Sequence, residues 1–271
     1  MSVPQPRGPS QALWQYHSRS DRHSKVACWG VLFDLLQQSS LLGKHANAGK
    51  VVLGVNHELR DFQTKRKKNL DLVVAKPAGP GEKKPRTMAS LADEWGIVIT
   101  STQAAKLNGL PPLVEGVVGS AVMLAMEAKA AMTAHSKARP RLYDELNSSH
   151  QTVHGASNQA LAVGFVMVNV STTFVSPDLN KTPGQSTVVS QHNQPRDARG
   201  IVAKVEEIPR RSNSTQQGYD GLAIVAIECA NDGTPVTLVT GPPAPQPGEI
   251  YHYDSMIARV ATEYDTTFAN I

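Results

Sequence analysis

The run AVMLAMEAKAAM, at residues 121–132, is the feature that most constrains the fold of this chain. Its nearly continuous apolar character is typical of a strand buried inside a sheet. Glu127 and Lys129 interrupt it near its end, with one alanine between them. Because side chains two positions apart in a strand point to the same face, we expect this acid and base to share a face, with Met126 and Ala128 on the other. Charged groups in an apolar strand need partners, so the pattern predicts a polar site at the end of the strand.

A single carboxylate occurs in a similar position on an earlier strand. The segment KNLDLVVAKP, at 68–77, is strand-like and ends at Pro77, and Asp71 lies between apolar neighbours within it. We expect the two strands to be adjacent, so that Asp71, Glu127 and Lys129 converge. Two carboxylates supply the oxygen ligands that Mg²⁺ takes in proteins, together with waters and substrate phosphate. A lysine beside them can orient the attacking water and offset charge in the transition state.

The rest of the chain alternates helical and strand-like patterns, which predicts an α/β fold with a mixed central sheet flanked by helices. The expected helices are 10–38, 90–96, 101–109, 140–156, 198–208 and 253–268, and the expected strands are 50–59, 68–77, 118–129, 160–175, 221–230 and 236–241. Residues 1–10 are expected to form a flexible tail and 11–271 a single domain. Within it we expect a core at about 11–175, an insertion at 78–118 between the second and third strands, and a C-terminal strand and helix extension at about 198–271.

Asp71 in one strand and Glu127-Ala128-Lys129 in the next resemble the PD-(D/E)xK motif of the restriction-endonuclease-like nuclease superfamily. The order of helix, three strands, helix and strand over about 11–175 resembles the αβββαβ core of that family. The resemblance implies that Asp71, Glu127 and Lys129 are catalytic, and that Asp71 and Glu127, completed by the carbonyl of Ala128, bind Mg²⁺, for which Mn²⁺ would substitute. It also implies that Glu58, or an acid of the first helix such as Asp34, could supply the additional acid that some members use.

Two features depart from the family pattern. Leu70 stands where many members have a proline before the aspartate. The separation of Asp71 and Glu127 along the chain is also longer than usual, so segment 78–118 must be an insertion that leaves the two strands adjacent.

The function implied is a Mg²⁺-dependent endodeoxyribonuclease of restriction type that hydrolyses phosphodiester bonds of double-stranded DNA. Cutting both strands favours a homodimer, since each site cuts one strand. A DNA repair or recombination nuclease and a non-catalytic DNA-binding protein of the same fold are the alternatives. A further alternative is structural: Glu127 and Lys129 would then be a surface pair and Asp71 a buried, hydrogen-bonded acid.

The charge of the chain suits an anionic partner, because its net charge is +4 and its pI is about 9.0. Basic clusters lie beside both strands of the expected site, and part of the helix at 140–156 is polar enough to face a groove. The side chains expected to contact DNA are Lys65, Arg66, Lys67, Lys68, Lys137, Arg139, Arg141, Asn147 and Ser148. His150 and His154, four apart on that helix, have the spacing of a zinc pair, but with no third ligand at a typical offset they fit packing better.

Other classes of protein find little support in the sequence. It contains neither G-x-x-x-x-G-K-[ST] nor G-x-G-x-x-G, so we expect no nucleotide cofactor. No apolar run reaches the length of about 20 residues that a membrane helix needs, so we expect no membrane partner. Cys28 and Cys229 stand far apart without a C-x-x-C motif, which favours a reducing, cytoplasmic setting.

Overall fold

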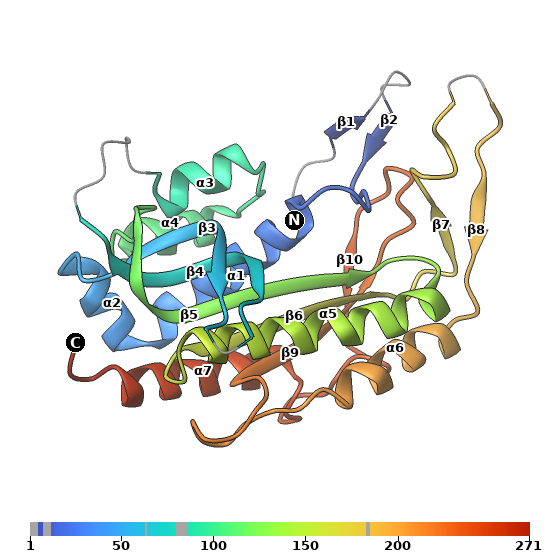
Figure 1. The fold of residues 1–271 in the computed structure, drawn as a ribbon. Coiled ribbons are helices and arrows are strands. Elements are labelled where there is room, and N and C mark those ends of the chain that lie inside the picture. Colours follow the sequence, from blue (N-terminus) through green and yellow to red (C-terminus); the bar gives the residue numbers. More distant parts are fainter. Residues whose placement is uncertain (1–4, 8–11, 63, 80–85, 183–184) are drawn as a thin grey trace.

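A mixed six-stranded sheet forms the centre of the molecule (Figure 1). The structure is a computed structural model that describes residues 5–7, 12–62, 64–79, 86–182 and 185–271. The strands lie in the order β10-β9-β6-β5-β4-β3. Their bounds are β3 Val52–Arg60, β4 Lys67–Pro77, β5 Val118–Ala131, β6 Leu161–Asn169, β9 Gly221–Glu228 and β10 Thr237–Val239.

The strand directions explain how the chain crosses the sheet. β3, β4 and β5 run antiparallel in sequence, β5, β6 and β9 run parallel, and β10 returns antiparallel to β9. Parallel neighbours need long crossover connections, and α5 (His135–Ala156) provides the one between β5 and β6. The connection from β6 to β9 contains α6 (Arg196–Glu206). The expected α/β class with a mixed sheet between helices is therefore confirmed.

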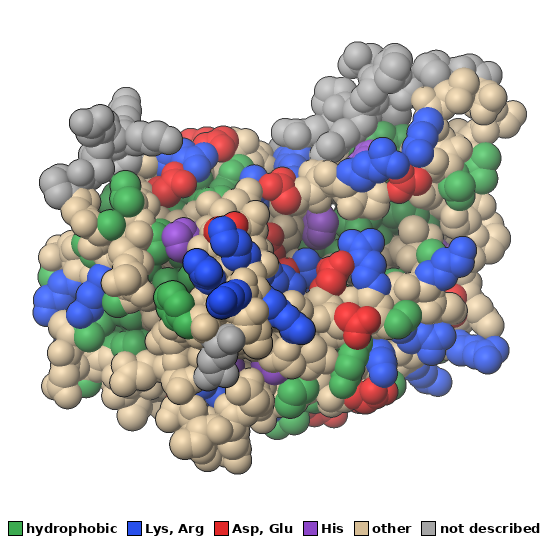
Figure 2. Space-filling model, viewed as in Figure 1, with side chains coloured by type: hydrophobic (Ala, Val, Ile, Leu, Met, Phe, Trp, Pro, Cys, Tyr) green, Lys and Arg blue, Asp and Glu red, His purple; other side chains and the backbone are tan. Residues whose placement is uncertain are grey.

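The hairpin that joins β3 to β4 carries a group of exposed Lys and Arg side chains on the face of the molecule seen in Figure 2. In the chain that follows β4, α3 (Met88–Glu94) and α4 (Ser101–Gly109) lie before β5 begins. They occupy the expected insertion 78–118, of which residues 80–85 lie outside the described part of the chain. This segment leaves β4 and β5 directly paired, as the expected site requires.

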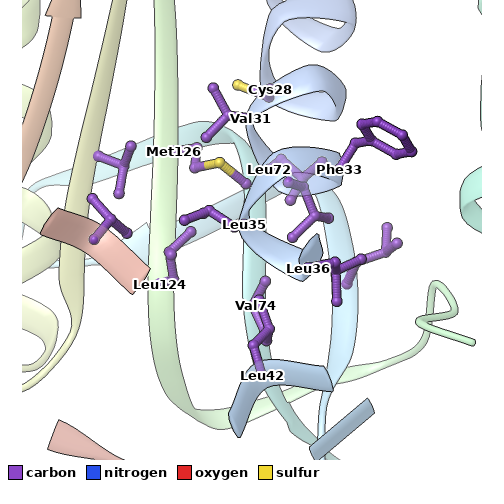
Figure 3. Close-up of a cluster of buried hydrophobic side chains, with 14 of the residues drawn as sticks. Cys28, Val31, Phe33, Leu35, Leu36, Leu42, Leu72, Val74, Leu124 and Met126 are labelled. Atoms are coloured by element: carbon purple, nitrogen blue, oxygen red, sulfur yellow. The ribbon is translucent and has the colours of Figure 1, made fainter. Parts of the chain in front are cut away.

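Helices cover both faces of the sheet. On one face α1 (Arg22–Gln38), with α2 (Ser40–Asn47) and α7 (Tyr253–Thr267), packs on a large apolar cluster. Figure 3 shows Leu35 and Val31 of α1 lying against Leu72 of β4 and Met126 of β5. On the other face α5 and α6 cover a second cluster, to which β5 contributes Ala125 and Ala131. The alternation along β5 therefore sends successive side chains into two separate cores.

Three expected boundaries are wrong. The first helix begins at Arg22 instead of residue 10, because the apolar residues before it do not keep helical spacing and residues 12–14 form β2 (Ala12–Trp14), paired with β1 (Gln5–Arg7). Residues 1–4 and 8–10 of the expected tail lie outside the described residues.

The fifth helix does not begin at Pro140. It starts at His135, whose ring nitrogen Nε2 lies 3.0 Å from the carbonyl oxygen of Asn169, and it runs through Pro140. Proline so early in a helix removes only one backbone hydrogen bond, which a well-packed helix of this length can tolerate.

The run expected as one strand at 160–175 is interrupted. β6 ends at Asn169, which is fully buried and whose side-chain amide donates to the carbonyls of Met132 and Cys229. The chain then turns into a short hairpin of β7 (Thr173–Val175) and β8 (Val189–Gln191). The buried amide satisfies carbonyl groups just beyond the ends of β5 and β9, where the ladder stops.

Within the described ranges, no helix is long and apolar enough to cross a membrane.

Candidate functional site

β4 and β5 separate at the expected site. Their backbone pairing ends with Leu72 opposite Met126. Beyond that pair, the side chain of Asp71 contacts the backbone of β5. The carboxylate oxygen Oδ2 of Asp71 accepts a hydrogen bond of 2.8 Å from the backbone amide of Ala128. Asp71 thus replaces a strand partner for this amide, and the aspartate of one strand is held directly beside Glu127 of the next.

The first turn of α1 holds the other oxygen of Asp71. The hydroxyl of Ser24, which is buried, lies 2.8 Å from Oδ1 of Asp71 and 2.8 Å from the carbonyl oxygen of Asp21. A hydroxyl has one proton, so it can donate to only one of these oxygens at a time. Asp21 precedes the helix and pairs with Lys25 at 2.8 Å.

Glu127 is the most deeply buried acid of the site, with 3% of its surface exposed. Its oxygen Oε1 lies 2.6 Å from Nζ of Lys129 and 3.9 Å from Nζ of Lys68. Its second oxygen, Oε2, has no hydrogen-bond partner in the described structure. A buried carboxylate oxygen without a partner is costly, so this atom marks the place where a further positive or hydrogen-bonding group would be stabilising.

Helix α5 contributes Glu145 to the site, from the face of the sheet that α5 and α6 cover. Oε2 of Glu145 lies 3.3 Å from Nζ of Lys129, and Oε1 of Glu145 is 2.7 Å from Nε of Arg141. Lys68 donates to the backbone carbonyl of Glu145 at 2.7 Å. Acidic and basic groups therefore alternate from Glu127 through Lys129 and Glu145 to Arg141.

The pKa shifts follow from this arrangement. Burial raises the pKa of Asp71 above its ordinary value, and the hydrogen bonds from Ala128 and Ser24 oppose the shift only in part. Burial also raises the pKa of Glu127. The positive charge of Lys129 opposes this increase, and the negative charge of Asp71 adds to it. For Lys129, burial lowers the pKa, but the carboxylates of Glu127, Glu145 and Asp71 together outweigh it, so the net shift is upward. The lysine is therefore an ammonium ion at neutral pH.

A cavity of about 510 Å³ opens beside these groups and is lined by Asp71, Ala128 and Lys129. Other wall residues come from the segment before α1, from α1 itself and from α5, and among them are Tyr16, Arg19, His23, Lys137 and Arg141. His23 packs against Tyr16 with ring centroids 4.9 Å apart. Burial, with the charge of Lys129, lowers the pKa of His23 to about 4, so its imidazole is neutral at physiological pH.

Sequence reasoning missed several polar wall residues, among them Asp21, His23, Ser24 and Glu145. A signal was present in the pattern SDRHS, residues 20–24, before an apolar periodic run; it could have placed the start of the helix near Arg22 but not the contact of Ser24 with Asp71. Glu145 lies within the helix that was expected to follow the E-x-K strand, and nothing in its spacing singled it out.

The residues able to hold a metal are Asp71 and Glu127. No group of three or more His, Cys, Asp or Glu side chains arranged for a metal occurs among the residues that the structure describes. The donor set that is present, two carboxylates with one oxygen lacking a partner, still fits Mg²⁺, which keeps several waters and takes one or two protein carboxylates. Ala128 contacts Asp71 through its amide hydrogen, whereas the resemblance implies a role for its carbonyl.

The other expected residues fall into three groups. Lys68, Lys137 and Arg141 lie at the cavity or its ion-pair network. The β3–β4 hairpin carries Lys65, Arg66 and Lys67, which lie farther from the cavity than Lys68 does. Glu58 is exposed on the same hairpin and pairs with Lys67 at 2.7 Å.

The remaining expected DNA contacts lie along α5 with different surroundings. The guanidinium of Arg139 lies over Gly200 of α6. The side-chain amide of Asn147 donates to the carbonyl of Tyr143 at 3.1 Å, and Ser148 is half-buried. His150 and His154 are buried, with Nε2 of His154 2.8 Å from the carbonyl of Gly218.

Comparison of the chain with protein-family models, with curated proteins and with solved structures gave no match.

Proposed function

We propose that this protein is a Mg²⁺-dependent endodeoxyribonuclease that hydrolyses phosphodiester bonds of double-stranded DNA, in the manner of restriction enzymes. The observation that carries the proposal is the partnerless oxygen of Glu127, buried beside Asp71 and the ammonium group of Lys129. The order α1-β3-β4-β5-α5-β6 also parallels the αβββαβ core of the restriction-endonuclease-like superfamily. Mn²⁺ is expected to substitute for Mg²⁺.

Each residue of the site has a separate role in this proposal. Asp71 and Glu127 would hold the ion, which, when bound, supplies Lewis-acid stabilisation of the phosphate and makes a water more acidic. Lys129 orients the attacking water and stabilises negative charge on the phosphate oxygens, because it remains protonated. Glu145 and Arg141 hold the lysine in position, and the amide of Ala128 fixes the carboxylate of Asp71.

The basic groups near the cavity supply the charge that a DNA backbone needs. Lys68, Lys137 and Arg141 are close to the carboxylates, while Lys65, Arg66 and Lys67 extend the basic surface onto the hairpin. Each phosphate contact steepens the salt dependence of binding. Cleavage of both strands would be served by two copies of the chain, one for each strand.

Plasmid digestion tests the proposal. Supercoiled and linear DNA are incubated with Mg²⁺, with Mn²⁺ and with EDTA, and we expect cleavage in the first two only. Glu127→Gln is expected to lower the rate at least about 100-fold, since it removes a ligand whose ion contributes several kcal/mol to the barrier. Glu206→Gln, at an exposed position on α6, is the matched control and is expected to cut normally. Absence of metal-dependent cleavage by the wild-type protein would refute the proposal.

A non-catalytic DNA-binding protein is the second candidate. It is favoured by the ion pairs of Glu127 with Lys129 and Lys68, which give the carboxylate a structural role. Such a protein would shift DNA in a gel without cutting it at any metal concentration. Discrete fragments from the wild-type protein would point to a restriction enzyme, and a smear to a less specific repair or recombination nuclease.

A further inference from the structure

The turn of the β3–β4 hairpin presents an aromatic ring to solvent. Phe62 is 73% exposed, more than any other large apolar side chain among the described residues. Scattered exposed apolar residues are ordinary on protein surfaces. The surroundings of Phe62 are what distinguish it.

Hydrogen bonds hold the backbone amides of Phe62 and of Asp61, the residue before it. The amide of Phe62 donates to the carbonyl of Gly155, at the end of α5, at 3.1 Å, and the amide of Asp61 donates to the carbonyl of Arg66 at 2.9 Å. Asp61 is 5% exposed and accepts hydrogen bonds from the amide and hydroxyl of Thr64. Gly155 leaves no room for a side chain, because a methyl group there would overlap the carboxyl group of Asp61. The ring is therefore displayed by a turn that is anchored to α5.

Exposed cations precede and follow the ring along the hairpin. Arg60, Lys65, Arg66 and Lys67 are all exposed, and Lys67 is paired with Glu58, which is itself exposed. Figure 2 shows the Lys and Arg side chains gathered over this hairpin. Positive charge around a single exposed aromatic ring complements a polyanion with flat apolar surfaces between its charges, which describes DNA.

We propose that the hairpin turn is a DNA-binding element in which Phe62 inserts between bases of the duplex and the surrounding cations bind the flanking phosphates. This inference rests on the proposed nuclease function, since DNA is the substrate in both. The strand from Arg66 to Asp71 spans about 17 Å at about 3.3 Å per residue. This corresponds to about five base-pair steps at about 3.4 Å each, so one duplex reaches both the hairpin and the site. Apolar side chains inserted at base steps unstack and bend DNA, and basic neighbours hold the phosphates.

Binding and base stacking are measured in EDTA, so that cleavage plays no part. The probe is a short duplex that carries 2-aminopurine, whose fluorescence rises when it is unstacked from its neighbours. With wild-type protein we expect a rise at one position of the probe. Phe62→Ala is expected to weaken binding about tenfold and to abolish the rise, while leaving the salt dependence of binding unchanged. Phe62→Trp is expected to retain both, because it preserves the aromatic surface.

Two further variants separate the ring from the charges and from general surface hydrophobicity. Arg66→Ala is expected to reduce the slope of log affinity against log salt by about one and to leave the fluorescence rise in place. Leu238→Ala, at a 66% exposed position on β10 at the opposite edge of the sheet, is the matched control and should bind as wild type.

The outcomes distinguish this inference from the proposed function. If the wild-type protein cuts DNA and Phe62→Ala binds and unstacks the probe equally well, the hairpin proposal is wrong and the nuclease stands. If the protein binds with a Phe62-dependent fluorescence rise but never cuts, the hairpin proposal stands and the nuclease does not. Phe62-dependent binding to anionic vesicles without binding to the duplex would assign the hairpin to a membrane surface and overturn the proposal.

Discussion

Replacing Asp71 separates its structural from its chemical role. In Asp71→Ala the amide of Ala128, a residue that is 2% exposed, loses the acceptor that now lies 2.8 Å away. An unsatisfied buried donor costs about 1–3 kcal/mol, so the free energy of unfolding should fall by that amount. In Asp71→Asn the side-chain oxygen still accepts from Ala128. Its NH₂ group can donate to Ser24, which frees the serine proton for the carbonyl of Asp21.

The two substitutions should therefore differ in stability. The pKa of Asp71 is raised in the folded protein, so the stability that it contributes is fully present below its ordinary pKa of 3.8 and is lost as pH rises through the folded value. Both variants lack this loss, but only Asp71→Asn keeps an acceptor for the amide of Ala128, so near neutral pH it should be at least as stable as the wild type and more stable than Asp71→Ala. Both variants should lose Mg²⁺-dependent cleavage.

Urea denaturation in EDTA at several pH values measures these differences, with the slope of the unfolding free energy checked for constancy. The reasoning would be refuted if Asp71→Asn were as unstable as Asp71→Ala, since the negative charge would then be needed to hold the strands. Full cleavage by Asp71→Asn would instead remove the residue from the metal site.

Three other predictions address the lysine, the buried histidines and the hairpin anchor. Lys129→Ala should lower the cleavage rate with little change in DNA affinity. Lys129→Arg should retain part of the rate, because it keeps the positive charge. Equal rates for the wild type and Lys129→Ala would contradict the role assigned to the lysine. Burial lowers the pKa of His150 from 6.5 to about 4, so the unfolded chain binds a proton more readily than the folded protein does. The free energy of unfolding should therefore fall by about 3 kcal/mol between pH 6.5 and pH 4 because of this histidine. Thermal unfolding of His150→Leu across that range should show a smaller acid loss than the wild type, and an identical loss would count against the assignment. Gly155→Ala should lower the free energy of unfolding by about 1–3 kcal/mol, because the added methyl group overlaps the carboxyl group of Asp61. An unchanged urea midpoint would show that the hairpin can shift away from α5 without loss of stability.

The sequence predicted the site strands well because their side-chain pattern is local. The apolar runs around Asp71 and Glu127 have strand length and end at recognisable turn residues, and the structure pairs these strands directly. That adjacency depended only on reading the segment between them as an insertion. The role of the residues as metal ligands, which came from the family resemblance, stays a prediction.

The contacts that complete the site could not be predicted because they join distant segments. Ser24 and Glu145 reach the site through the packing of α1 and α5 on opposite faces of the sheet, and no sequence spacing encodes that docking. The start of α5 was misplaced for a related reason. Proline is favoured at the first position of a helix, so the helix was expected to start at Pro140, but in the folded protein it starts at His135, which is held by its contact with Asn169.

The four elements that supply the site also make its formation depend on the whole sheet. β4 and β5 bring the two acids together, α1 binds one of them through Ser24, and α5 reaches the lysine through Glu145. A chain in which α5 has not yet docked on β5 would hold Asp71 and Glu127 without the partners that orient Lys129. The assembled charge network therefore requires α1, β4, β5 and α5 to be packed together, so a change that loosens the docking of α5 should disturb Lys129 without altering either strand.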